Sequence, residues 1–221
     1  MRPPHPLPFG YCATFSVVAY DASSQSWGVA VQSKFFAVGS AVPWGSAGTG
    51  ALATQAMVNP RFGPIGLAML RQGMSAAETV AALVAGDSGS AMRQVGVVDR
   101  SGTAASYTGG ACFPWAGHIV GDGFCCQGNI LSGPAVIEEM ARTLRAAANL
   151  PLPERLVAVL AAGQAAGGDS RGQQSAALLV LRADAGFFGY SDRAVDLRVD
   201  DHAAPITELG RLLQLHHETF G

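Results

Sequence analysis

The chain has 221 residues with a net charge of −2 at pH 7, and only 14% of its residues are charged while 49% are hydrophobic. This length suffices for one sizeable core and is short for two ordinary domains. The charge excludes a basic field for nucleic acid or anionic lipid, and no apolar run reaches the ~18–20 residues of a membrane span. With so little charge to coat the globule, we expect a homodimer.

The N-terminal segment holds four prolines within residues 1–12 and lacks a secretory apolar region. We therefore expect residues 1–13 to form a disordered leader and residues 14–221 a single domain. The four cysteines include the adjacent pair Cys125 and Cys126, which makes a poor disulfide framework, and no pair has CxxC spacing. These features predict a cytoplasmic protein with cysteines in its core and without a zinc site.

Strand-like patterns begin at Thr14 and alternate with short polar turns, which is typical of antiparallel hairpins. The expected strands cover residues 14–20, 27–33, 41–43, 50–55, 95–99, 103–108, 117–120, 123–127, 175–182 and 195–199. Ser75 and Glu78 form a capping-box pattern that opens a helix to about residue 85. Further helices are expected at residues 64–72, 135–148 and 154–164, and from Pro205 onward.

Three of the expected strands, at residues 29–31, 95–98 and 176–181, are apolar without clean alternation. Such strands are covered on both faces. Because the turns between strands are of hairpin length, the strands must be antiparallel. Two packed antiparallel sheets with helices outside each sheet satisfy both conditions, so we expect an α+β fold of the four-layer αββα sandwich type.

The chain has a single lysine, Lys34, and it lies in the apolar stretch of residues 28–39. An ammonium in apolar surroundings is costly unless it is paired, and lysine, unlike arginine, loses its proton readily when buried. Two interpretations are open. Lys34 could tune a catalytic group, or it could lie at the end of a strand with its ammonium in water.

Thr14 opens the first strand, and the partner strand ends near Lys34. Cross-strand geometry could therefore place the Thr14 hydroxyl beside the Lys34 amine. A threonine at a free N-terminus can use its own α-amino group as the base that activates its hydroxyl. The structural alternative is that Thr14 is simply a good strand former.

The glycine-rich segment of residues 167–172 contains Asp169 and Arg171. Its backbone N–H groups could bind an anion and Arg171 could hold a carboxylate, or the two side chains could simply pair with each other.

Other polar residues could line the same site. Asn129 and Gln127 could donate to a developing oxyanion, or could satisfy strand-end backbone groups instead. Thr54, Gln55 and Asn59 follow an apolar strand and have the same two interpretations. His118 is interpreted as a packed histidine. Cys112 is a weak alternative nucleophile because no activating partner is evident.

Several segments together resemble the bacterial and archaeal family catalogued as domain of unknown function 1028. They are Thr14–Ala19, Gly28–Gly39, Val42–Trp44, Thr54–Ala56, Asn59–Pro60, Pro114–His118, Gln127–Leu131, Gly163–Gly172 and Asp196–His202. This resemblance implies an N-terminal-nucleophile hydrolase fold. Carried over to this sequence, it makes Thr14 the expected nucleophile and Lys34 its electrostatic partner, but it implies no known substrate. Our leading hypothesis is a hydrolase of a small amide (C–N) substrate, with neither metal nor organic cofactor.

Members of that family commonly begin at the threonine that matches Thr14, whereas 13 residues precede it here. Either the start lies further downstream, or the Ala13–Thr14 bond is cleaved, or Thr14 has no free amine. A non-catalytic binding or assembly protein on the same fold is therefore a second hypothesis, and a hydrolase with another nucleophile is a third. A Thr14→Ala variant distinguishes them.

Overall fold

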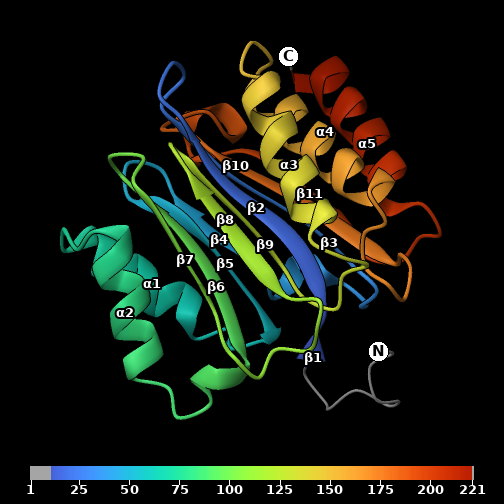
Figure 1. Ribbon diagram of the computed structural model, residues 1–221. Coiled ribbons are helices and arrows are strands. Elements are labelled where there is room, and N and C mark those ends of the chain that lie inside the picture. The colour runs from blue at the N-terminus through green and yellow to red at the C-terminus, as the bar shows by residue number, and fades with distance from the viewer. Residues whose placement is uncertain (1–10, 221) are drawn as a thin grey trace.

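The computed structural model describes residues 11–220, and these form four layers (Figure 1). Two antiparallel β-sheets pack against each other, and helices cover the outer face of each sheet, as expected. One sheet contains the strands β1 (Tyr11–Cys12), β4 (Pro43–Ser46), β5 (Gly50–Met57), β6 (Arg93–Asp99) and β7 (Ala104–Thr108). The other sheet has the strand order β11 (Arg193–Val199), β10 (Ser175–Leu181), β3 (Ser26–Ser33), β2 (Thr14–Asp21), β9 (Phe124–Gly128) and β8 (Gly117–Gly121).

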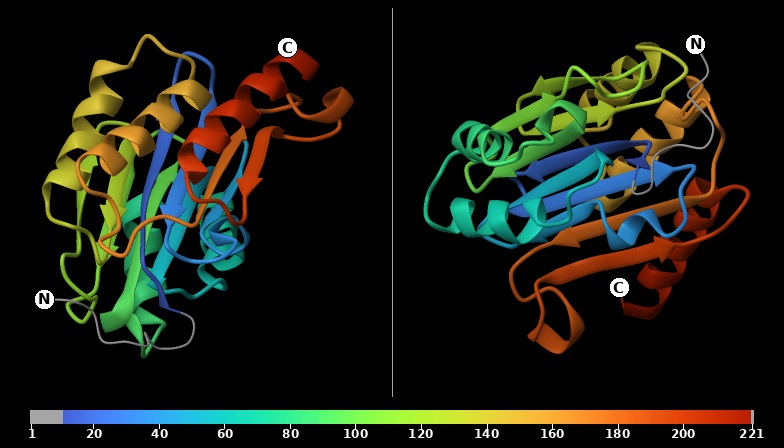
Figure 2. Two further views of the ribbon diagram at one scale, coloured as in Figure 1. Left: turned by 90° about the vertical axis from the view of Figure 1, so that its right-hand side faces the viewer. Right: turned by 90° about the horizontal axis from the view of Figure 1, so that it is seen from below.

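The helices divide between the two outer faces (Figure 2). The five-stranded sheet is covered by α1 (Phe62–Arg71) and α2 (Ala76–Ala85), and the six-stranded sheet by α3 (Ala135–Ala146), α4 (Leu152–Ala165) and α5 (Pro205–Phe220). The expected capping box is present at α2, where Ser75 and Glu78 each bind the other's backbone N–H. Within residues 11–220, no helix combines the length and apolar character needed to cross a membrane.

The three apolar strand segments are buried as expected. Val29 and Val31 lie between the two sheets, whereas Leu178 and Val180 pack under the helices of the six-stranded sheet. Successive residues of one strand enter different apolar layers: Ala177 packs between the sheets, whereas its neighbour Leu178 packs under the helices.

The start of the chain corrects one expectation. Residues 11–13 do not belong to a disordered leader, because Tyr11, Cys12 and Ala13 are all buried and β1 is paired with β5. The β4 strand pairs with Gly50–Ala53 of β5, and β1 pairs with Ala56 and Met57 further along. Because β6 covers the opposite edge of β5, β1 extends the edge that β4 leaves open. The expected leader at positions 1–10 lies outside the described residues.

Candidate active site

Thr14 lies at the first position of β2, opposite Ser33 at the last position of β3. Its side chain is fully buried and faces the five-stranded sheet. The hydroxyl Oγ1 donates to the Cys12 carbonyl oxygen at 2.8 Å and lies 3.3 Å from Ser33 Oγ and 3.2 Å from Cys12 Sγ. Burial raises the pKa of the Cys12 thiol to about 11, so this thiol is a neutral neighbour.

The carbonyl group of the peptide bond before Thr14 is held by two side chains. Ser33 Oγ donates to the Ala13 oxygen, and Arg171 Nη2 donates to the same oxygen at 3.2 Å. A hydroxyl and a guanidinium therefore converge on one carbonyl oxygen beside the Thr14 hydroxyl. Donors in this arrangement stabilise negative charge that develops on such an oxygen.

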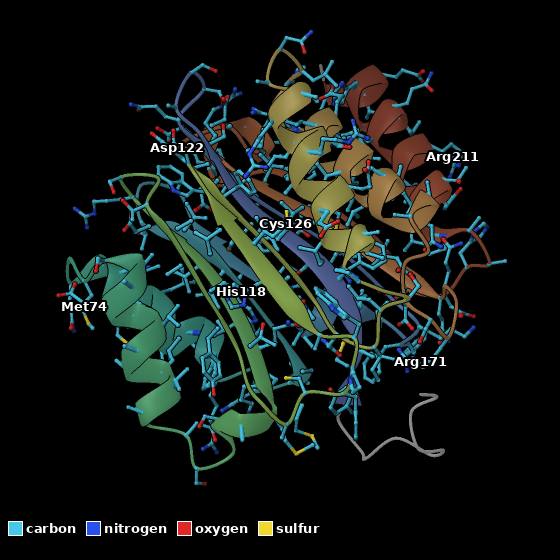
Figure 3. All side chains as sticks on the ribbon, in the orientation of Figure 1. Met74, His118, Asp122, Cys126, Arg171 and Arg211 are labelled. Atoms are coloured by element: carbon cyan, nitrogen blue, oxygen red, sulfur yellow. The ribbon has the colours of Figure 1, made fainter. Side chains whose placement is uncertain are left out.

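Arg171 is fixed in position by Asp169. Its Nε donates to Asp169 Oδ1 at 3.0 Å and its Nη2 to Oδ2 at 2.6 Å, which makes a bidentate ion pair. The Asp169 side chain is fully buried, and its Oδ2 also accepts the backbone N–H of Lys34 at 3.1 Å. The expected pairing of Asp169 with Arg171 is present, and it leaves the guanidinium able to reach the Ala13 carbonyl as well. In Figure 3, Arg171 lies at the end of the sheets where β1 is found.

The glycines before this pair have a conformational role. Gly167 and Gly168 have φ angles of 116° and 55°, a region that L side chains rarely adopt. They turn the chain after α4 so that Asp169 bridges to Leu131. This turn places the Arg171 guanidinium beside the Ala13 carbonyl oxygen.

A network of amide side chains fills the space between the sheets next to Thr14. Gln55 accepts from Ser16 Oγ at 2.6 Å and donates to Gln94 Oε1 at 2.8 Å. Gln127 donates to the same Ser16 hydroxyl at 2.7 Å, and Asn129 donates to Gln94 at 3.0 Å. The network also holds β2, because the Thr14 carbonyl accepts the Asn129 backbone N–H at 3.0 Å. Of the expected residues, Gln55, Gln127 and Asn129 thus meet at the Thr14 end of the sandwich.

Comparison with known proteins assigns the chain to a family. The model of a family of unknown function, DUF1028, matches residues 14–209. The chain belongs to this family. The crystal structure of a DUF1028 protein from Silicibacter pomeroyi, SPO2555, is similar with a TM-score of 0.84 and 32% identity, covering 92% of this chain and 85% of that one. The search of curated proteins gave no match.

The match to the DUF1028 model begins at Thr14, so Tyr11–Ala13 lie outside the region matched to the family. Two residues that pack against Tyr11 and Ala13 have backbone φ angles that are rare for residues other than glycine. Ala56 and Ile130 are buried and have φ angles of 65° and 53°, although neither is glycine. Non-glycine residues in this region are strained, and such strain clusters at functional sites.

Lys34 lies where the second of its two interpretations places it, at the end of a strand, and not beside the Thr14 hydroxyl. Its side chain is exposed rather than buried, and Nζ donates to the Gln173 carbonyl oxygen at 3.1 Å. The residue that faces Thr14 from β3 is Ser33, one position earlier. Because side chains on successive residues of a strand point to opposite faces, this single step takes the lysine away from the Thr14 hydroxyl. The cation that approaches Thr14 is Arg171.

Two further expected residues form a separate group. The Thr54 hydroxyl lies 3.4 Å from the Asn59 carbonyl oxygen, and Asn59 Nδ2 donates to Asp87 Oδ2 at 3.0 Å. Arg93 pairs with Asp87 at 2.7 Å, and its hydrogen bond lowers the pKa of that carboxyl to about 2. These contacts connect the turn after β5 with the segment after α2, and they do not include Thr14.

His118 and Cys112 remain, and His118 is exposed at the surface of β8 rather than packed as expected. His118 Nδ1 and the Thr108 hydroxyl are 2.8 Å apart, and partial desolvation by its neighbours lowers the pKa of His118. Burial raises the pKa of Cys112 to about 11, which disfavours the reactive thiolate.

Ser16, Ser33 and Gln94 also belong to the site and were not predicted from the sequence. All three are fully buried polar residues at or near strand ends that face the other sheet. Their signal was a polar side chain on an otherwise apolar strand face, which requires a partner.

Proposed function

We propose that this DUF1028 protein is an N-terminal-nucleophile hydrolase of a small amide, and that its active form begins at Thr14. One observation carries the proposal: the Thr14 hydroxyl lies beside a carbonyl oxygen that both Ser33 and Arg171 hold. A nucleophile next to a paired set of oxyanion donors is the arrangement that acyl transfer requires.

In the proposed reaction, the free α-amino group of Thr14 takes the hydroxyl proton as Oγ1 attacks the substrate carbonyl carbon. The carbonyl oxygen becomes an oxyanion within reach of Ser33 and Arg171, the two donors that hold the Ala13 oxygen in the full chain, and they stabilise it. The C–N bond then breaks, and the leaving amine receives the proton from the Thr14 amino group. The products of this step are a free amine and an ester between the acyl group and Thr14.

Water completes the cycle. The Thr14 amino group takes a proton from water as the water oxygen attacks the ester carbonyl carbon, and the same two donors stabilise the second oxyanion. The ester C–O bond breaks, Oγ1 regains its proton, and a carboxylic acid leaves. Gln55 and Asn129 keep β2 in place throughout, because their hydrogen bonds to the Thr14 carbonyl do not involve the reacting atoms.

The amino group needed for this chemistry is tied up in the Ala13–Thr14 peptide bond of the full chain. Thr14 is also fully buried beneath residues 11–13. The active form therefore requires the removal of residues 1–13, which exposes the amine and the hydroxyl together. In the full chain the site is latent.

The test determines the N-terminus of the protein and screens that protein for hydrolysis of small amides. We expect mass spectrometry of protein from the native host to give a chain that starts at Thr14 and that hydrolyses members of a panel of small amides. Thr14→Ala should lower turnover by about 10³-fold or more with unchanged unfolding, while Thr14→Ser should retain part of the activity. An intact Met1–Gly221 chain with full amidase activity would rule the proposal out.

A non-catalytic binding protein is the second candidate, and one observation favours it. A cavity of about 280 Å³ lies away from Thr14, lined among others by Trp44, Arg193 and Arg198. A small ligand could bind there while Thr14 stays covered. If Thr14→Ala binds ligand as the parent protein does and neither protein turns any amide over, this second candidate replaces the first.

The expected homodimer and cytoplasmic location stay predictions. Sedimentation equilibrium at micromolar concentration tests the first, and only monomer would contradict it. Fractionation of the native host tests the second.

A further inference from the structure

We propose that the groove filled by Tyr11–Ala13 is the subsite for the acyl part of the substrate, and that it takes an extended peptide-like chain. This chain would carry a small side chain at the reacting carbonyl and an aromatic ring two residues before it. The inference rests on the proposed function, because the groove opens only when residues 1–13 leave. It adds a substrate class, a short peptide or N-acylated amino-acid amide, to the proposed reaction.

The backbone of the segment indicates how such a ligand would bind. Tyr11 and Cys12 pair with Met57 and Ala56 of β5 as an antiparallel strand. Removal of the segment leaves the end of this sheet edge unpaired, since β4 reaches only to Ala53. An open sheet edge binds extended peptides through main-chain hydrogen bonds, with pockets for alternate side chains giving specificity.

The first pocket holds the Tyr11 ring. Its centroid lies 4.7 Å from that of Phe113, and its hydroxyl accepts the Phe113 backbone N–H at 2.9 Å. The ring is 2% exposed and packs with Ile130, while Met57 and Met92 close the pocket from outside. A bulky ring with one polar group at its far end is therefore enclosed on its apolar sides and hydrogen-bonded at its tip.

The second pocket holds Ala13, whose carbonyl group lies next to the position proposed for the reacting carbonyl. Its methyl group is fully buried in the same cluster as Tyr11 and contributes to contacts with Ala56 and Ile130. Both neighbours are buried and have the strained backbone described above, so the walls of this pocket have little freedom to move. A side chain much larger than alanine would overpack it.

The residue between them faces the opposite way. Cys12 is fully buried in the layer between the sheets, packed with Val18, Val31 and Val38. The alternation of Tyr11 and Ala13 on one side with Cys12 on the other is that of a bound strand. A substrate is thus read at three consecutive positions as aromatic, small and small, followed by the amide that Thr14 cleaves.

The test uses the full chain and a peptide rather than turnover. The double variant Tyr11→Asp/Ala13→Asp places two carboxylates in the buried groove, which should expel the segment and open the groove. The probe is acetyl-Gly-Tyr-Cys-Ala carboxamide in reducing buffer, with binding measured by calorimetry. We expect this peptide to bind the variant at least about tenfold more tightly than the parent chain, whose groove is filled.

Two altered peptides give the specificity. Replacement of the last alanine of the probe by phenylalanine, or of its tyrosine by serine, should each weaken binding by about tenfold or more. Equal binding of all three peptides, or no binding to a variant whose circular dichroism matches that of the parent, would overturn the inference. If the double variant does not fold, Tyr11→Ser in the full chain, which keeps an uncharged segment, serves for the same measurements.

Failure of this inference can be distinguished from failure of the proposed hydrolase. Specific peptide binding without any turnover would sustain the subsite and contradict the hydrolase. Turnover of amides that lack this pattern, together with absent peptide binding, would sustain the hydrolase and contradict the subsite.

Discussion

The two faces of strand β2 differ sharply, although both are buried over residues 14–19. On the face toward the other sheet, Thr14 and Ser16 take part in hydrogen bonds with side chains from β3, β5 and β9. On the opposite face, Phe15 and Val17 pack in the apolar layer beneath α3 and α4. One strand thus supports both a polar network and an apolar core, separated by a single residue step.

The difference indicates that the two faces of β2 have different roles. Burial of apolar side chains stabilises the fold without fixing a hydroxyl within tenths of an ångström. Buried hydrogen-bonded groups add little net stability, but each has a strong requirement for its partner and therefore fixes geometry. We infer that the helix-facing side of β2 holds the sandwich together and that the sheet-facing side orients Thr14.

Phe15→Ala should produce the largest effect and should change stability alone. Phe15 is fully buried under the helices, so its truncation should lower the free energy of unfolding by about 3–5 kcal/mol. Urea unfolding measures the loss, and activity per folded molecule should stay within about twofold. Phe15→Leu is the control and should cost less than half as much. A specific activity that falls with Phe15→Ala would show that the two faces are not independent.

The double variant Asp169→Asn/Arg171→Met should, in contrast, lower turnover more than it lowers stability. It removes the guanidinium from the Ala13 carbonyl position and also avoids leaving the buried Asp169 carboxylate unpaired. In the form that begins at Thr14, we expect turnover to fall by about 10²-fold with a smaller change in unfolding than for Phe15→Ala.

Arg171→Lys is the matched control for charge. It keeps one positive charge but cannot hold Asp169 in bidentate fashion and reach the carbonyl oxygen at once. It should therefore retain only a minor part of the activity. Turnover equal to that of the parent protein in both variants would remove Arg171 from the proposed oxyanion site.

Gln55→Leu and Thr54→Val compare neighbouring residues on opposite faces of β5. Gln55→Leu removes the acceptor of the buried Ser16 hydroxyl and one of the two amide donors to Gln94 Oε1, so the free energy of unfolding should fall by about 1–3 kcal/mol. Turnover should fall as well, because β2 loses a support. Thr54→Val removes only a 3.4 Å contact to Asn59 and should change both quantities by less than half as much. Equal effects of the two substitutions would contradict a special role for the polar network.

The sequence predicted the fold more completely than the site. Apolar strands joined by hairpin-length turns were enough for the αββα layers, because burial on both faces and antiparallel pairing leave few other architectures. The pairing of the start of β2 with the end of β3 was also predicted. Its exact register was not, and a register error of one residue exchanges the faces of a strand. That error put Lys34 in the place of Ser33.

Because of the four prolines before residue 9, disorder was expected up to residue 13, and the short strand β1 was not predicted. Tyr11–Ala13 gives too short a pattern to be identified as a strand, and its burial depends on pockets formed by β5 and by residues 113 and 130, far along the chain. Arg171 was identified as a candidate. The Ala13 carbonyl oxygen could not be identified as its partner, because only the folded turn at Gly167 and Gly168 brings the Arg171 guanidinium to that oxygen.

Lys34→Met should have the smallest effect, and it sharpens the assignment of the cation at the site. The Lys34 side chain is exposed and its single described hydrogen bond runs to the Gln173 carbonyl oxygen, so its loss should change unfolding by less than about 0.5 kcal/mol. The backbone N–H of Lys34, which Asp169 accepts, is unaffected by the substitution. Turnover should therefore stay within about twofold, since a solvated charge acts weakly over distance. A loss comparable to that of Asp169→Asn/Arg171→Met would mean that the lysine, rather than the arginine, supplies the positive charge that Thr14 requires.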